Sequence, residues 1–247
     1  MHDSEIKYSY NETTGRGPSR WGQLDPSWYL CGNGTRQSPI DILRLRARLR
    51  LDLGDLQRDY KPTPATLNNS GPYVQLKWIG DAGAIFIDGI KYQLLHCHWH
   101  SPSEHKFNGL RFVLELHLVH KNSIGETAVV GIVYKYGQPN PFLSKVFREI
   151  RSLGRNGTRE IPLGIVNPRD IEYGGILSRK YYRYNGSFST PPCHEGVIWT
   201  LHEQFQTVSL EQLRALKEAV KEEFEINARP IQSLNGRPVY VNVPWMI

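Results

Sequence analysis

The sequence predicts a mainly β protein: a largely antiparallel sheet with a few helices on its surface. Strand-like runs recur along most of the 247 residues, whereas only two segments have helical periodicity. Glycine and proline are plentiful, with 22 and 16 residues, and aromatic residues make up 11% of the chain. This composition suits many strands joined by tight turns. The closely spaced runs leave little room for the helical crossovers that parallel strands require.

Seven runs have the length and composition of strands: residues 73–78, 84–87, 92–100, 112–120, 128–136, 197–202 and 239–243. Residues 43–51 alternate arginine with apolar residues, which predicts a half-buried strand with a solvated arginine face. Residues 142–153 and 210–220 carry apolar stripes at helical spacing. Pro139 and Pro141 precede the first helix, and Ser209 and Gln212 form a capping box that begins the second. No linker, repeat or low-complexity tract divides the chain, so we expect one domain.

Four of the nine histidines lie in two short runs, residues 96–100 and 115–117. His96, His98 and His100 alternate along a predicted strand, so their side chains leave the same face. Glu115 and His117 share one face of the next predicted strand in the same way. Three imidazoles that converge from two neighbouring strands form the ligand set of a catalytic zinc site, with a fourth position open for water. A single histidine is more often a packed or surface residue, but this pattern favours the metal site.

Asn108-Gly109, between the two strands, is the dipeptide most favoured in a two-residue hairpin turn. Such a turn pairs the residues on either side of it and, further along, places His100 opposite His117. His98 then lies diagonally from His117, within reach of a shared ion. Pro102 and the polar residues 103–104 must interrupt this ladder, so the predicted register is approximate.

The net charge of +6 and the isoelectric point near 9.2 invite a nucleic-acid interpretation. The basic residues are scattered or alternate with apolar ones, and no stacking motif accompanies them, so we expect no nucleic-acid partner. Attraction to an anionic surface or wall polymer fits the charge better. No apolar run approaches the roughly 20 residues of a membrane span. No signal peptide is visible, and Met1 is interpreted as a start residue placed before a mature N-terminus.

The cysteines and the N-glycosylation sequons bear on the compartment. Cys97 lies between two candidate ligands on the opposite strand face, where we expect it to pack as a small apolar residue. Cys31 and Cys193 could pair. Five sequons are compatible with secretory passage, and they begin at Asn11, Asn33, Asn68, Asn156 and Asn185. Together these features favour an oxidising compartment.

Several motifs, in their order and spacing, resemble those of the alpha-class carbonic anhydrases from about residue 10 to residue 244. They are Arg36-Gln37-Ser38-Pro39-Ile40-Asp41, His98-x-His100, Ser103-Glu104-His105, residues 115–120, residues 187–192 and Asn227-x-Arg229-Pro230. Residues 98–105 and Pro192-Cys193 are most similar to the secreted plant branch, which includes yam tuber storage proteins. The resemblance implies a single domain over residues 1–247, built on a large, mostly antiparallel, twisted central sheet with a few surface helices. Residues 1–9 would form a flexible N-terminal segment.

The resemblance implies that a zinc-bound hydroxide attacks carbon dioxide, with His98, His100 and His117 as the zinc ligands. Zinc lowers the pKa of bound water to about 7, an effect for which carbonic anhydrase is itself the standard example. Glu115 lies on the same face as His117, where it is suited to accept that ligand's other N–H and fix its tautomer. The carbonyl of Asn227 would serve His100 in the same way.

Ser189 and Glu104 would orient the hydroxide. The Ser189 hydroxyl donates to the buried carboxylate and must therefore accept from the hydroxide, which aims it at the substrate. Thr190 and Tyr10 match further positions of the family's catalytic cavity. The implied substrate pocket consists of residues whose apolar members are otherwise more often plain core: Gln75, Val119, Val129, Phe188, Val197 and Trp199.

Three positions depart from the family pattern. Ser189 stands where threonine is usual, so the hydroxyl is kept but the methyl that restricts its rotamer is lost. His96 replaces a glutamine that accepts the first ligand's N–H; a neutral histidine can also accept, although an arrangement with His96 itself as a ligand stays open. Pro72 replaces the histidine that carries protons to buffer in rapid family members, which leaves no proton shuttle. Tyr73 and Tyr10, with an ordinary pKa near 10, are poor substitutes at pH 7.

We therefore expect a zinc lyase that hydrates carbon dioxide at moderate turnover. Its partners would be the small molecules carbon dioxide and bicarbonate, and it would be a monomer or a homodimer. The alternative is a storage or binding protein on the same fold, as some plant relatives are, but the presence of all three ligands favours the enzyme. The expected location is the secretory pathway, in the apoplast, the vacuole or the plastid lumen.

Overall fold

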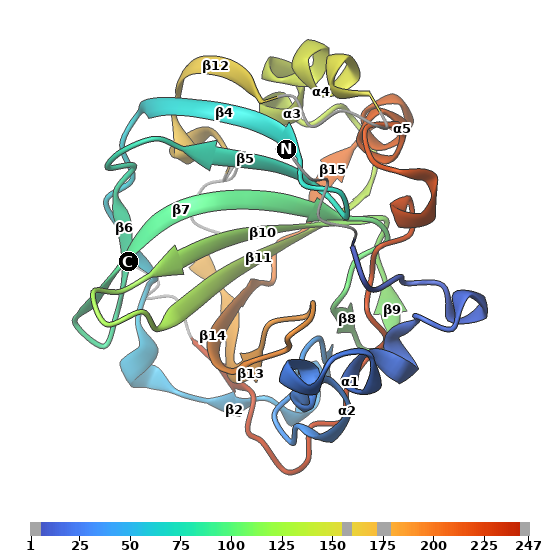
Figure 1. Cartoon of the computed structure of the whole chain (residues 1–247). Helices are drawn as coiled ribbons and strands as arrows, with labels where there is room; N and C mark the ends of the chain where they lie inside the picture. Colours follow the sequence, from blue (N-terminus) through green and yellow to red (C-terminus); the bar gives the residue numbers. More distant parts are fainter. Residues whose placement is uncertain (1–5, 155–159, 172–178, 243–247) are drawn as a thin grey trace.

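A large twisted sheet runs through the molecule, with helices gathered beside it (Figure 1). The computed structural model describes residues 6–154, 160–171 and 179–242. From one edge to the other, the sheet consists of β12 (Ile161–Val166), β4 (Thr63–Asn69), β5 (Val74–Trp78), β7 (Ile90–His100), β10 (Leu114–Lys121), β11 (Thr127–Tyr136), β14 (Glu195–His202), β13 (Tyr181–Ser187), β16 (Tyr240–Val241) and β2 (Arg48–Leu49). Beside this path lie β15 (Gln206–Val208), β6 (Ala84–Ile87) and β3 (Gln57–Arg58). A separate small sheet contains β1 (Asp41–Ile42), β8 (Lys106–Phe107) and β9 (Leu110–Arg111).

Most strand pairs of the large sheet are antiparallel, which confirms the predicted fold class. Within the described residues, the parallel pairs of this sheet are β11–β14, β11–β15 and β16–β2. A parallel pair needs a long connection. Between β11 and β14 the chain forms α3 (Pro141–Lys145) and α4 (Phe147–Leu153) before it returns through β12 and β13. The sheet is therefore mixed because of the long connection between β11 and β14 and because the short strands β15 and β2 pair in parallel with their neighbours.

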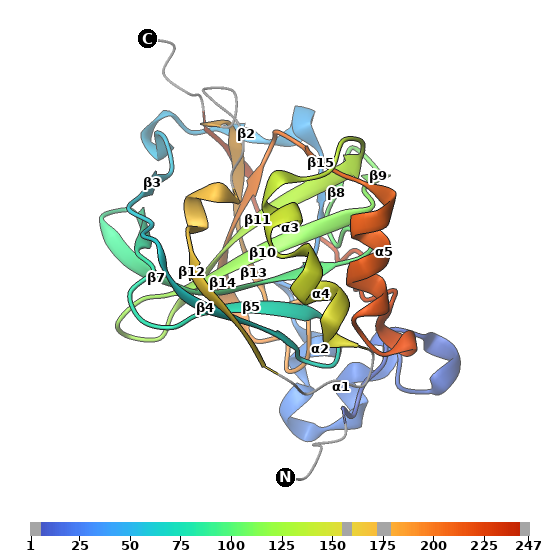
Figure 2. The same ribbon diagram turned by 90° about the horizontal axis from the view of Figure 1, so that it is seen from above.

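The helices lie in two groups (Figure 2). α3, α4 and α5 (Leu210–Glu218) lie together over one face of the sheet, while α1 (Trp21–Leu24) and α2 (Leu30–Asn33) belong to the N-terminal part. The predicted helix 142–153 is broken at Val146, where φ is −110° and ψ is 11°, although its apolar stripe is buried as predicted. α5 begins at the predicted capping box, with both reciprocal hydrogen bonds between Ser209 and Gln212. Short 3-10 helices are η1 (Glu12–Thr14), η2 (Pro18–Arg20), η3 (Pro26–Trp28), η4 (Arg44–Arg46), η5 (Leu51–Leu53), η6 (Pro168–Asp170) and η8 (Glu222–Phe224).

The sheet has apolar packing on both faces. Alternate residues of β10 show this: Leu116 and Leu118 belong to the core cluster that includes the residues of α3–α5, whereas Val119 belongs to a second cluster with Val129 and Trp199. Because successive strand residues point to opposite faces, Glu115 and His117 share the face of Val119. The candidate metal ligands therefore project into the second, smaller core.

The longer strands β4, β12 and β13 escape the sequence-based prediction, as do the short strands β1, β3 and β15. β4 contains Pro64 and two asparagines, β12 contains Pro162 and Gly164, and β13 reads Tyr-Tyr-Arg-Tyr-Asn-Gly-Ser. Their composition resembles that of loops, and pairing with neighbours determines their structure instead. The predicted half-buried strand at residues 43–51 is wrong. Only β2 forms there, between two 3-10 turns at the edge of the sheet, and Leu45, Leu49 and Leu51 are exposed.

The ends of the chain modify two further predictions. Residues 1–5 lie outside the described residues, but the rest of the expected flexible segment is held in place. The ring of Tyr8 packs edge-to-face on Trp21 at 5.2 Å, and Ser9 is fully buried. Of the predicted strand 239–243, β16 comprises Tyr240–Val241, and residue 243 is not described. No helix within the described ranges is long and apolar enough to cross a membrane.

The sequons differ in accessibility. Asn11, Asn33 and Asn185 are exposed, and Asn68 is half-buried within β4. Asn156 lies outside the described residues. Three of the predicted acceptor sites are thus open to solvent in the folded chain.

Candidate metal centre

The pairing of β7 with β10 brings the histidine-bearing strands together. Its register places His98 directly opposite His117 and His100 opposite Glu115. The predicted register, with His100 opposite His117, is therefore wrong by two residues. The hairpin turn forms as predicted between β8 and β9, but the connection 101–105 is longer than the connection 112–113 on the other side. This unequal length shifts the ladder beyond the turn.

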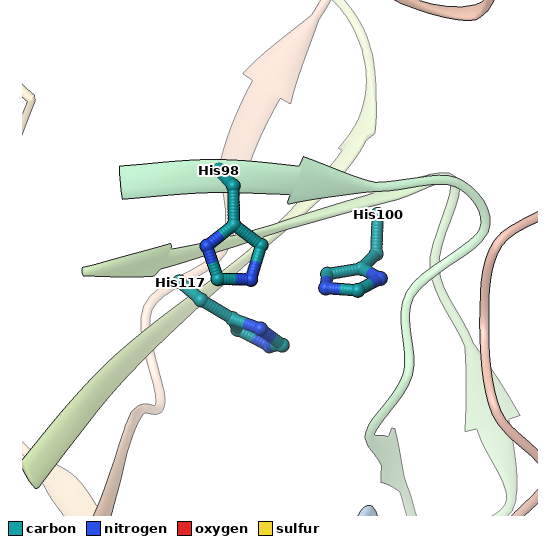
Figure 3. A group of neighbouring side chains, drawn as sticks. All are labelled: His98, His100 and His117. Atoms are coloured by element: carbon teal, nitrogen blue, oxygen red, sulfur yellow. The ribbon is translucent and has the colours of Figure 1, made fainter. Parts of the chain in front are cut away.

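His98, His100 and His117 converge on one small volume (Figure 3). One ring nitrogen from each lies within 4.8 Å of the other two, and the ring centroids are 4.7–5.2 Å apart. All three side chains are buried. Burial lowers the pKa of His98 and of His100, which favours the neutral imidazole that binds metal.

In two of the three histidines, a hydrogen bond occupies one ring nitrogen and leaves the other free. Nδ1 of His100 lies 2.7 Å from the carbonyl oxygen of Asn227, and Nε2, which is buried, has no hydrogen-bond partner. Nε2 of His117 lies 2.8 Å from Oε1 of Glu115, which leaves Nδ1 on the side of the other two histidines. Glu115 and Asn227 are thus placed to fix the tautomers of their neighbours, as predicted from their positions.

His98 lacks such support. Its Nδ1 atom is buried without a hydrogen-bond partner, and the His96 ring lies beside it with centroids 5.5 Å apart. The predicted hydrogen bond, in which His96 accepts the N–H of His98, is therefore absent from the described residues. Burial and the nearby Lys121 and Lys77 lower the pKa of His96 to about 4, so this ring is neutral at pH 7. Tyr73 stacks on the other side of His98, with ring centroids 4.3 Å apart.

A buried network behind His117 was not predicted. Glu115 accepts from the backbone N–H of His105 at 2.8 Å, and its Oε1 atom lies 2.7 Å from Nδ1 of His105. Nε2 of His105 lies 2.7 Å from the hydroxyl of Tyr184, which donates to Ser38 at 2.8 Å. Although burial opposes ionisation, His105 and His117 hold the pKa of Glu115 well below its ordinary value. The sequence contains one indication of this network, since His105 follows directly after Glu104 in the family motif.

Glu104 faces the same volume from the opposite side. Its Oε1 atom accepts the backbone N–H of Arg229 at 3.0 Å. Its Oε2 atom is buried without a hydrogen-bond partner, 3.8 Å from Nε2 of His100 and 4.0 Å from Nδ1 of His117. Ser189 is buried and borders the cavity, but the described residues show no hydrogen bond between Ser189 and Glu104. The orienting pair is therefore adjacent to the site without the predicted direct bond.

A cavity of about 260 Å³ opens onto His98 and His117. Five of the predicted catalytic or pocket residues border it beside Ser189, namely Val119, Val129, Phe188, Thr190 and Trp199. Val197 is buried in the adjoining core cluster, and Gln75 pairs with His98 from β5, but neither is among the residues that line the cavity. Tyr10 packs against Tyr8 and Trp21 instead, and burial raises its pKa far above its ordinary value.

Pro72 is buried and does not border the cavity, while its neighbour Tyr73 does. The carbonyl oxygen of Pro72 accepts from the side-chain amide of Asn227 at 2.6 Å, so this backbone helps to hold the Asn227 carbonyl on His100. Burial, with a contribution from Glu104, raises the pKa of Tyr73. No side chain described at residues 72–73 can therefore exchange a proton readily near pH 7.

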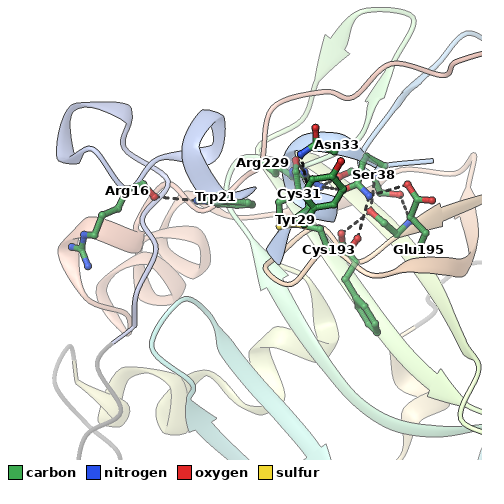
Figure 4. Close-up of a disulfide and its surroundings, with 12 residues drawn as sticks. Arg16, Trp21, Tyr29, Cys31, Asn33, Ser38, Cys193, Glu195 and Arg229 are labelled. Carbon is green, nitrogen blue, oxygen red and sulfur yellow. Dashed lines mark hydrogen bonds between the residues drawn. A yellow bond between two sulfur atoms is a disulfide. The ribbon is translucent and has the colours of Figure 1, made fainter. Parts of the chain in front are cut away.

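The predicted disulfide between Cys31 and Cys193 is present, and Cys97 is free and buried (Figure 4). The guanidinium of Arg229 donates to the carbonyl of Cys31 at 2.8 Å and to that of Ser38 at 2.9 Å. Burial lowers the pKa of Arg229 to about 10. Because the backbone of Arg229 also holds Glu104, the N-terminal segment, the disulfide and the site form one connected unit.

The donor set fits zinc. Three buried imidazoles that each bring one ring nitrogen close to those of the other two, with supporting acceptors behind two of the rings, are typical of a zinc site with an open fourth position. His105, Glu115 and His117 form a second group with metal-ligand atoms close together, but their hydrogen bonds to one another already use these atoms. The first group is therefore the candidate metal centre.

Comparison with known proteins points to one protein family. The family model for eukaryotic-type carbonic anhydrase matches residues 16–243. The chain belongs to this family. Alpha carbonic anhydrase 4 of Arabidopsis thaliana is 45% identical, over 98% of this chain and 88% of that protein. Dioscorin dioA3 of Dioscorea japonica is 42% identical, over 96% of this chain and 86% of that protein.

Solved structures of the carbonic anhydrase family have the same fold. Dioscorin complexed with ascorbate aligns with a TM-score of 0.93 at 40% identity, over 98% of this chain and 100% of that one. The alpha-carbonic anhydrase from Thermovibrio ammonificans, in complex with the inhibitor sulfanilamide, aligns with a TM-score of 0.84 at 33% identity, over 94% and 98% of the two chains. The plant relatives agree with the branch suggested by the sequence motifs.

Replacing His98, His100 or His117 with alanine should each remove most bound zinc, because each change deletes one of three protein ligands. His96→Ala is the matched control and should keep zinc, with affinity reduced at most about tenfold. Metal analysis of the purified variants measures this. Zinc retained by His98→Ala but lost from His96→Ala would show that the ligand assignment is wrong.

Replacing both Cys31 and Cys193 with alanine should lower the free energy of unfolding by up to about 5 kcal/mol. The bridge closes a loop with a sequence separation of 162 residues, which restricts the unfolded chain. Denaturant titration with and without reductant measures the change. Reductant should destabilise the natural chain and Cys97→Ala alike and leave the double variant unaffected; an equal response from all three would contradict the assignment.

Proposed function

We propose that the protein catalyses the reversible hydration of carbon dioxide to bicarbonate and a proton, with Zn²⁺ held by His98, His100 and His117. The observation that carries this proposal is the convergence of three buried histidines, two of which, His117 and His100, have their outer nitrogens held by Glu115 and Asn227. When bound, zinc supplies hydroxide near neutral pH by lowering the pKa of a coordinated water. Carbonic anhydrases of plants are similar over nearly the whole chain, which supports the same assignment.

The protein's own contribution begins with orientation of the ligands. Glu115 accepts the Nε2–H of His117, and the carbonyl of Asn227 accepts the Nδ1–H of His100, so each ring presents its other nitrogen to the metal. Glu115 is itself fixed by His105, whose second nitrogen meets Tyr184. These successive hydrogen bonds keep the imidazole rings from rotating during turnover.

Ser189 and Glu104 position the attacking group. Glu104 is buried and has one oxygen without a partner, so the Ser189 hydroxyl has an acceptor close at hand once the site is complete. A hydroxyl that donates to this carboxylate can only accept from the nucleophile, which fixes the direction of attack. An apolar wall is formed by Val119, Val129 and Trp199. Carbon dioxide can lie against this wall without competing with water for hydrogen bonds.

Proton removal is the slow step in this proposal. Pro72 has no titratable group, and burial raises the pKa of Tyr73, so neither carries protons to solvent at neutral pH. Turnover then depends on small buffer molecules that enter the cavity. The oxidising secretory pathway, in the apoplast, the vacuole or the plastid lumen, is the proposed location, since the Cys31–Cys193 bridge requires such a compartment.

Storage or small-molecule binding is the second candidate function. Dioscorin dioA3 is 42% identical to this chain, and a dioscorin has been solved in complex with ascorbate. The unpartnered Oε2 atom of Glu104, which makes no hydrogen bond with Ser189, and the unpartnered Nδ1 atom of His98 favour this alternative. The three ligands and the closed supporting network favour the enzyme.

Ser189→Ala should lower kcat for carbon dioxide hydration about 100-fold or more without loss of zinc, because the variant can bind metal but cannot aim the nucleophile. Ser189→Thr is the matched variant, and it should retain or increase kcat, since its methyl group restricts the hydroxyl rotamer. Stopped-flow hydration assays beside metal analysis measure both. A zinc-loaded natural protein with no hydration activity would refute the enzymatic function and favour storage or binding.

The maximal hydration rate of the natural protein should rise several-fold with the concentration of an imidazole-type buffer, because the buffer performs the missing proton transfer. Tyr73→Phe should leave this dependence unchanged, since the Tyr73 hydroxyl takes no part. The second-order rate constant for carbon dioxide should not respond to buffer. A high rate that is independent of buffer would mean that another residue carries the proton.

A further inference from the structure

A second cavity, of about 310 Å³, lies on the sheet face opposite the metal centre. Ile198 of β14 lines it, whereas the next residue, Trp199, borders the metal-site cavity instead; from β13, Arg183, Tyr184 and Asn185 all line the second cavity. We call it the arginine cavity, because its wall includes Arg36, Arg50, Arg183 and Arg237, together with Asp88 and Tyr240. The proposed carbon dioxide chemistry uses none of these residues.

Arg183 is the most informative residue of this cavity. Its side chain is only 8% exposed, and it lies over the ring of Tyr181 at 4.8 Å. Nε donates to Thr200 at 3.2 Å, but the buried Nη2 group has no hydrogen-bond partner. Burial also lowers the pKa of Arg183. A buried cationic donor without a partner is costly, so its presence at a cavity wall calls for an acceptor from outside the chain.

The other arginines leave the cavity with excess positive charge. Arg36 pairs with Glu195 at 3.4 Å, and Arg50 pairs with Asp52. Arg237 donates only to backbone carbonyls, and no carboxylate of the described residues pairs with Arg237 or Arg183. Asp88 is the single acidic residue that lines the cavity. Neither guanidinium group therefore forms an ion pair within the described chain, although Asp88 acts electrostatically on Arg183 and Glu195 on Arg237.

The rest of the cavity wall can accommodate the carbon skeleton of a small organic molecule. Leu53 and Ile198 line the cavity beside the ring of Tyr240, and the volume lies at the small end of the range for small-molecule sites. A wall polymer would need a line of exposed cations, whereas Arg183 is buried and reachable only by a compact group. Guanidinium groups bind the oxygens of phosphate and carboxylate in a forked geometry.

We infer that the arginine cavity binds a small organic oxyanion, with its charged group on Arg183 and Arg237 and its apolar part on Ile198 and Tyr240. This site is separate from the metal centre and does not depend on the proposed function. Asn185, an exposed sequon asparagine, lies at the same cavity, so a glycan there would cover the entrance.

Calorimetric titration of the zinc-loaded protein, produced without glycans, with phenyl phosphate tests the inference. We expect one site in the natural protein that persists after the metal is stripped with a chelator, which separates it from the metal centre. Inorganic phosphate, which lacks the apolar part, should bind at least tenfold more weakly. Arg183→Gln should weaken phenyl phosphate binding at least tenfold, whereas Arg214→Gln on the exposed face of α5 removes the same charge and should have no effect.

Asp88→Asn provides a gain of binding that a misfolded variant cannot imitate. Asp88 has φ of 50°, a conformation that asparagine tolerates, so this change removes a negative charge without backbone strain. Phenyl phosphate should bind several-fold more tightly to Asp88→Asn. No binding to the natural protein, equal binding to Arg183→Gln, or no gain for Asp88→Asn would each overturn the inference.

Discussion

The antiparallel pairing of β7 with β10 is the constraint on which the site depends. It sets His98 opposite His117 and His100 opposite Glu115, so that four chemically active side chains leave one face into one small volume. A slip of β10 by one residue would turn Glu115 and His117 into the core now occupied by Leu116 and its neighbours. Apolar packing on both faces of the sheet therefore fixes the geometry of the metal centre.

Arg229 links this strand pair to parts of the chain that are distant in sequence. Its backbone holds Glu104, its side chain holds the carbonyl of Cys31, and its neighbour Asn227 holds His100. The disulfide continues the connection to the turn that carries Ser189. A single buried cation thus contributes both to stability and to the arrangement of the candidate site, because truncation of its side chain would leave the carbonyls of Cys31 and Ser38 and the amide oxygen of Gln37 without this donor.

The sequence predicts what is encoded locally. Residues 92–100, 112–120 and 128–136 are long apolar or alternating runs, and they correspond to β7, β10 and β11. The cluster of candidate histidines therefore follows from their spacing, whereas the choice of His98, His100 and His117 over His96 follows from the family resemblance. The register is not predictable in this way, because it depends on the lengths of two irregular connections. The contact between His105 and Tyr184 joins residues 79 positions apart, and the stretch around Tyr184 reads as a loop. The unpartnered Arg183 likewise becomes visible only when β13 is paired and buried.

The three candidate metal ligands lie within twenty consecutive residues on adjacent strands, and Glu104 lies between them in the sequence, while Ser189 and Asn227 reach the site only when distant segments have come together. Zinc occupancy and turnover are consequently two independent reports on the same molecule. Zinc occupancy reports on the pairing of β7 with β10. Turnover reports on whether the rest of the chain has folded against this pair. A preparation that is saturated with metal yet stays slow when buffer is abundant has therefore failed at the distant segments that complete the site, not at its ligands.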